Sequence, residues 1–89
     1  MNRITLRSHD GSYHIAEDDI EKAIHMLGKF EDAYEELVDS IERIPSELEA
    51  MRIQGKEKTV RYKETIAQKL INNNIVAFFE RHGLKKDNE

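Results

Sequence analysis

The stretch Ile20–Ile44, IEKAIHMLGKFEDAYEELVDSIERI, has a heptad spacing of apolar residues that decides the fold. With Ile20 taken as position a, no a or d position through Ile44 is polar, which is the spacing of a coiled coil. Apolar residues at e and g widen the face beyond what one partner helix covers, so the pattern favours a helix in a bundle. The a and d positions are Ile20, Ala23, Leu27, Phe30, Tyr34, Leu37, Ile41 and Ile44.

Pro45 directly follows this stretch and predicts a break, because proline has no backbone N–H and clashes with the preceding helical turn. Ser46 and Glu49 have the spacing of a capping box, so we expect a new helix to start there and to end at Gly55. The sequence therefore predicts an acidic helical segment over 17–54 that is broken at Pro45, with Gly28 as a second place where it could kink. Asp18 followed by Glu21 is a weak cap for its start.

An alternative exists for residues 51–62, where MRIQ and TVRY flank GKEK. These two short runs alternate apolar and polar residues, which is also the pattern of a β-hairpin. In that case Met51, Ile53, Val60 and Tyr62 would share one face.

The N-terminal residues 1–16 predict a β-hairpin around the Asp10-Gly11 pair, which is typical of a two-residue turn. A two-residue loop pairs Leu6 with Ile15 and Arg7 with His14. This register places the apolar residues of the ribbon on one face. They are Ile4, Leu6, Tyr13 and Ile15.

The last predicted helix runs over 58–83 and ends at Gly83, where a left-handed glycine followed by Leu84 fits a Schellman motif. Residues 84–89 are expected to form a frayed tail. One helical stripe follows most of this helix. It consists of Ile66, Ala67, Leu70, Ile71, Asn74, Ile75, Phe78 and His82.

Together these elements predict a single, mainly α domain over 1–89: an N-terminal β-hairpin and a long antiparallel helical hairpin. Two helices alone bury too little apolar surface to offset the entropy of ordering them. We therefore expect a homodimer that forms a four-helix bundle. The predicted interface consists of Leu27, Phe30, Tyr34, Leu37, Ile41, Ile66, Leu70, Ile75 and Phe78.

The net charge of −4 hides an uneven distribution. Residues 16–50 hold twelve acidic and three basic residues, whereas residues 51–89 hold nine basic and five acidic ones. The basic stretch Gly55–Lys69, GKEKTVRYKETIAQK, either matches the acidic helix or contacts nucleic-acid phosphates, with Tyr62 available to stack on a base. The nucleic-acid reading would also use the outer face of the β-ribbon. Its contact residues are Arg3, Arg7, Lys56, Lys58, Arg61, Lys63 and Lys69.

Signatures of catalysis and of cofactor or metal binding are missing from the sequence. The chain of 89 residues has no cysteine, and GKEKT departs from a phosphate-binding loop at Ala50 and Glu57. His9 and His14 have only Asp10 nearby as a third metal ligand. No apolar run is long enough to cross a membrane, and we expect a cytoplasmic protein.

These observations predict a non-catalytic, small acidic homo-oligomer that acts in protein–protein interaction or regulation and has no cofactor. The alternative is a dimeric nucleic-acid-binding regulator that uses the β-ribbon and the basic stretch 56–69.

Overall fold

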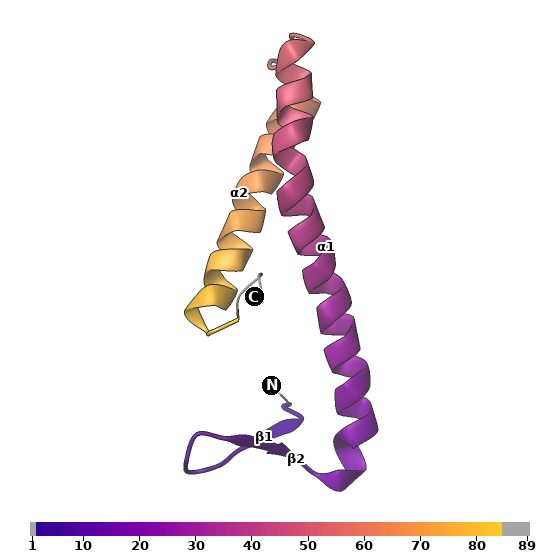
Figure 1. The fold of residues 1–89 in the computed structure, drawn as a ribbon, viewed down its shortest axis with the longest axis vertical. Helices are drawn as coiled ribbons and strands as arrows, with labels where there is room; N and C mark the ends of the chain where they lie inside the picture. The colour runs from indigo at the N-terminus through magenta and orange to yellow at the C-terminus, as the bar shows by residue number, and fades with distance from the viewer. Residues whose placement is uncertain (1, 85–89) are drawn as a thin grey trace. The chain divides into compact units, whose positions relative to one another are not determined.

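The computed structural model describes residues 2–84. Two short strands, β1 (Thr5–Arg7) and β2 (Tyr13–Ile15), precede the 3₁₀ turn η1 (Glu17–Asp19) and the helices α1 (Ile20–Ile53) and α2 (Val60–Arg81) (Figure 1). The prediction of a mainly helical chain with an N-terminal antiparallel hairpin is confirmed. The chain divides into two compact units, with the boundary between Ala33 and Tyr34. The tail predicted to fray lies outside the described residues, except for Leu84.

The first unit contains the β-hairpin, whose register differs by one residue from the prediction. Thr5 pairs with Ile15, Leu6 with His14 and Arg7 with Tyr13. The predicted turn needs a positive φ at both central residues. Here Gly11 has a φ of 88°, but no residue other than glycine has a positive φ in the described chain.

A three-residue loop, 9–11, therefore replaces the predicted two-residue loop. Ser8 N–H donates to the Ser12 carbonyl oxygen at 2.8 Å, and Gly11 N–H donates to the Ser8 carbonyl oxygen at 3.1 Å. The Asp10 carboxylate accepts from the Ser12 N–H at 2.9 Å and from the Ser12 hydroxyl at 2.7 Å. These two hydrogen bonds favour the ionised form, and they lower the pKa of Asp10 below its ordinary value of 3.8.

The new register separates the apolar residues that we expected to share a face. Leu6 now lies on the face of His14, while Tyr13 and Ile15 lie on the other, and Leu6, Tyr13 and Ile15 are all exposed. A two-stranded ribbon with so little buried surface is marginally stable in water by itself.

The helix α1 is continuous from Ile20 to Ile53 and passes through both Gly28 and Pro45. The predicted break at Pro45 is therefore wrong, and so is the predicted new start at Ser46. An interior proline costs a helix roughly 3 kcal/mol. Packing offsets this cost, because the heptad spacing continues across the proline to Leu48 and Met51, which are both buried.

Between the helices, a glycine ends α1 and a threonine begins α2. Gly55 has a φ of 72°, and the N–H of the next residue, Lys56, donates to the Met51 carbonyl oxygen at 2.9 Å, as in a Schellman motif. The Thr59 hydroxyl oxygen then caps α2 by accepting from the Tyr62 N–H at 3.2 Å. The predicted stop at Gly55 is confirmed, and the alternative hairpin over 51–62 is wrong.

The C-terminal end of α2 follows the prediction closely. Gly83 has a φ of 85°, and the Leu84 N–H donates to the Phe79 carbonyl oxygen at 2.9 Å. The predicted Schellman ending is confirmed.

The core of the second unit lies beside the turn that joins the helices. In Figure 1, α2 and the adjoining half of α1 separate as they leave this turn. The turn end is therefore where buried side chains concentrate. Its core consists of Ile44, Leu48, Met51 and Tyr62.

Candidate interaction site

The face of α2 that packs against α1 is not the apolar stripe that the sequence predicted as an interface between chains. Tyr62, Asn72 and Val76 are its buried residues. Leu70 precedes Asn72 by two residues, and Phe78 follows Val76 by two. Two residues are about 200° of rotation around a helix, so Leu70 and Phe78 point away from α1.

An outer apolar face therefore runs along α2. Its side chains keep between 36% and 59% of their surface exposed, with Leu70 the most exposed. Exposed apolar side chains are common singly, but a contiguous row of them is typical of a site for association. We call this row the outer face of α2. It consists of Ile66, Leu70, Ile71, Ile75 and Phe78.

An aromatic cluster lies at the C-terminal end of α2. Phe78 lies 5.7 Å from Phe79 and 4.9 Å from His82 between ring centroids, and the Arg81 guanidinium carbon lies 5.4 Å from the Phe78 ring centroid. Phe79 turns inward, with its ring centroid 5.8 Å from that of Tyr34 on α1. Phe78 remains about half exposed, so the cluster supports its ring without covering it.

The predicted interface residues of α1 fall into two groups. Tyr34, Leu37 and Ile41 are half-buried within the second unit. Leu27 and Phe30, in the first unit, are exposed, as are Ile20 and Ile24 in the same part of the helix. The predicted interface residues of α1 are therefore covered to different extents, less so in the first unit than in the second.

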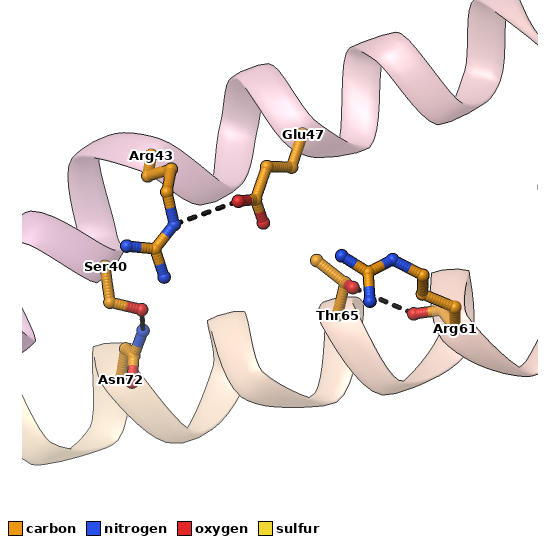
Figure 2. Close-up of polar contacts among 6 residues, drawn as sticks. All are labelled: Ser40, Arg43, Glu47, Arg61, Thr65 and Asn72. Atoms are coloured by element: carbon orange, nitrogen blue, oxygen red, sulfur yellow. Dashed lines mark hydrogen bonds and ion pairs between the residues drawn. The ribbon is translucent and has the colours of Figure 1, made fainter.

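A buried polar contact joins the two helices at Asn72, which is 3% exposed (Figure 2). Its side-chain amide donates to the Ser40 hydroxyl at 2.8 Å, and its side-chain oxygen accepts from the Gln68 amide at 2.8 Å. A buried amide that is satisfied in one alignment fixes the register of paired helices. Sequence reasoning missed this residue because it sought only apolar spacing.

Tyr62 is buried as well, with 8% of its surface exposed. The Arg52 guanidinium donates to the Tyr62 hydroxyl at 3.0 Å and to the Glu49 carboxylate at 2.9 Å. Both contacts raise the pKa of Arg52, with the hydrogen bond to Glu49 the larger cause. The Tyr62 ring belongs to the core cluster, so it is not available to stack on a nucleic-acid base.

The charged residues of the basic stretch do not pair with the acidic helix within the described part of one chain. The ion pairs among residues 2–84 are Arg43–Glu47 and Arg52–Glu49, both at 2.9 Å and both within α1. The side chains of the stretch remain exposed to solvent and without a carboxylate partner. They are Lys56, Lys58, Arg61, Lys63 and Lys69.

A shallow pocket of about 160 Å³ opens beside the Ser40–Asn72 contact. Arg43, Glu47 and Arg61 line it, and Figure 2 shows Arg61 on α2 extending into the space between the helices. Positively and negatively charged side chains both line this open, polar pocket, and nothing in it selects one ligand.

The remaining predicted contacts lie on the β-ribbon. Arg3 donates to the Thr5 hydroxyl at 3.1 Å, and Arg7 is exposed on β1. His14 Nδ1 lies 3.2 Å from the Ser8 hydroxyl oxygen. Within the described residues, no three His, Asp or Glu side chains group closely enough to hold a metal ion.

Neither helix among the described residues has an apolar stretch that could cross a lipid bilayer. Comparison of the chain with protein families, with curated proteins and with solved structures finds no match.

Proposed function

We propose that this protein is a non-catalytic, homo-oligomeric interaction or regulatory protein whose exposed apolar helix faces meet in a four-helix bundle dimer. The observation that carries the proposal is the outer face of α2. Leu70, Ile71 and Phe78 there point away from α1, with Ile66 and Ile75 beside them, and all five side chains remain 36–59% exposed. A second pair of helices is the simplest cover for such a face.

The energetics allow a dimer. Covering a half-exposed side chain of this size gains roughly 1 kcal/mol, so the outer faces of two chains together gain about 10 kcal/mol. Association costs roughly 4–15 kcal/mol. The exposed residues in the first part of α1, such as Leu27 and Phe30, add to the favourable side of this balance.

The test is the native mass by light scattering on a sizing column. We expect about twice the chain mass of 10.4 kDa. Leu70→Glu places a charge in the centre of the outer face and should reduce the mass to that of a monomer, because an unpaired charge is costly to bury. Leu70 is the most exposed residue of this face, so the fold of one chain should tolerate the change.

Ser46→Glu is the matched control. It adds the same charge to an exposed position of α1, about 200° around the helix from the buried Ile44, and should leave the dimer unchanged. A monomeric native protein would overturn the proposal. So would a Leu70→Glu variant that remains a dimer of undiminished strength.

The alternative function, a dimeric nucleic-acid-binding regulator, has one observation in its favour. The five bases of the stretch 56–69 make no ion pair within the described chain, so they are free to contact phosphates. The burial of Tyr62 removes the aromatic residue that this reading used for base stacking. We therefore place it second.

A further inference from the structure

We infer that the two copies of the proposed dimer meet through α2, with Asn74 of one chain hydrogen bonded to Asn74 of the partner subunit on the two-fold axis. This inference rests on the proposed function and names the contact at its centre. Two independent observations carry it: a polar side chain in the middle of the outer face of α2, and the scarcity of charge around that side chain.

Asn74 lies in the middle of the outer face of α2. It follows the buried Asn72 by two residues, or about 200° around the helix, so it points away from α1. Leu70 and Phe78 stand four residues before and after it, about 40° to either side, and both are exposed. The outer face therefore has an amide at its centre.

The Asn74 side chain differs from that of Asn72 in its hydrogen bonds. Asn72 donates to Ser40 and accepts from Gln68. Asn74 is exposed, and its amide forms no side-chain hydrogen bond within residues 2–84. Water satisfies the amide in a single chain. Once a partner covers the outer face, the amide becomes costly unless the partner offers it a donor or an acceptor.

A second Asn74 meets this requirement. An asparagine amide has an oxygen that accepts and an NH₂ group that donates, so two of them satisfy each other. A residue on a two-fold axis meets its own copy whichever way the two helices run. Leu70 and Phe78 of both chains then exclude water from the amide pair. Such a buried asparagine fixes the register and the number of chains in a helical assembly, at a cost in stability.

The distribution of charge favours a second copy as the occupant of this face. Although 36% of the residues in the chain are charged, the segment 65–79 contains a single charged residue, Lys69. Lys69 lies about 140° around the helix from Asn74, away from the centre of the outer face. Two identical surfaces repel each other wherever a charged residue meets its own copy. Apolar and amide side chains complement their own copies, and they offer a charged partner no counter-charge.

The first experiment is symmetric disulfide cross-linking of the full chain, which has no cysteine of its own. Two cysteines can form a disulfide only when their Cα atoms lie within about 7 Å, which favours a residue on the axis. The variant is Asn74→Cys. Its matched control is Asn73→Cys, at an exposed neighbour about 100° around the helix. Under mild oxidation, we expect Asn74→Cys to form the covalent dimer at least about tenfold faster on non-reducing gels.

A second pair of variants tests the hydrogen bond itself. Asn74→Asp keeps the size of the side chain and places two carboxylates together on the axis. We expect the dimer Kd from sedimentation equilibrium to rise at least about tenfold. Asn73→Asp adds the same charge beside the axis and should change the Kd by less than about twofold. Circular dichroism should show the same helix content in both, because both positions are exposed in a single chain.

An Asn74→Cys variant that cross-links no faster than its control, or equal effects of the two aspartates on the Kd, would overturn the Asn74 contact. The proposed function would still stand in that case if the native mass were that of a dimer. A protein that light scattering finds to be monomeric, with slow and equal cross-linking at both positions, would overturn both.

Discussion

At the scale of single residues, Asn72 is the side chain on which the pairing of α1 with α2 depends. It is the most deeply buried residue of α2, and both ends of its amide are hydrogen bonded. A polar residue inside a helical interface lowers stability relative to a well-packed apolar one, but it penalises every alignment in which its partners are absent. The contact with Ser40 therefore selects one register.

We predict that Asn72→Ala lowers the free energy of unfolding by about 1–3 kcal/mol, because the Ser40 and Gln68 side chains lose their partner and a cavity remains. The exposed neighbour provides the control: Asn73→Ala should be neutral or slightly stabilising, since alanine is the better helix former. Urea unfolding followed by circular dichroism measures both. Equal effects of the two variants would mean that Asn72 is not buried between the helices in solution.

Asp10 shows how one residue changes the register of a whole element. Its carboxylate accepts two hydrogen bonds from Ser12 across the turn. The backbone of Asp10 does not adopt the positive φ that a two-residue loop requires. The pKa of Asp10 is lowered in the folded hairpin. These bonds therefore stabilise the turn at pH values above the ordinary carboxyl pKa, and this stabilisation is lost as the pH falls through the lowered pKa.

At the scale of elements, α1 is a helix that tolerates a proline in its interior. The apolar positions on either side of Pro45 pack against α2, and this packing exceeds the local cost of the missing hydrogen bond. The proline side chain itself is exposed, so replacing it removes no core contact.

We predict that Pro45→Ala raises the free energy of unfolding by about 2–3 kcal/mol, because it restores the helical hydrogen bond to Ile41. Ser46→Ala distinguishes a continuous helix from a broken one. In a continuous helix, it should be neutral or stabilise by a few tenths of a kcal/mol. At a helix start, it would remove a cap and cost about 1 kcal/mol. A marked loss in urea unfolding of Ser46→Ala would therefore contradict a continuous α1.

The same elements show how far the sequence alone leads. Heptad spacing identified α1, and the glycines at 55 and 83 located two helix ends, because positive φ at a helix end is a local requirement. The break at Pro45 was predicted wrongly, because the proline was weighed without the apolar positions beyond it. Continuing the heptad to Leu48 and Met51 would have revealed them.

The inner face of α2 could not be predicted in this way. This helix has apolar residues on both sides, and the side with Tyr62, Asn72 and Val76 has fewer of them than the outer face. The spacing of apolar residues identifies the most apolar face of a helix. The pairing of α1 with α2 inside one chain depends instead on the turn, the cap at Thr59 and the Asn72 contact. The most apolar face thus remains outside, where the sequence predicted an interface between chains.

At the scale of the whole molecule, the separation of charge along the chain favours the proposed dimer. Like charges stand four residues apart on α1 at Asp32–Glu36 and Glu35–Asp39, which is unfavourable in an isolated helix. No base of α2 forms an ion pair with these carboxylates within the described chain. In the proposed dimer, a base of the partner that lies within about 10 Å of these carboxylates would reduce this repulsion.

We predict that Lys56→Gln with Lys58→Gln weakens the dimer about tenfold at low salt and much less at 0.5 M salt, because the acidic helix of the partner loses counter-charges. The matched control, Lys22→Gln with Lys29→Gln, changes the net charge equally but removes bases from the acidic half, so it should leave the dimer as strong or stronger. Sedimentation equilibrium measures both, and equal weakening would show that net charge alone governs association.

The nucleic-acid alternative predicts a different pattern for the Lys56→Gln, Lys58→Gln variant: an unchanged dimer that no longer binds a labelled oligonucleotide in fluorescence anisotropy.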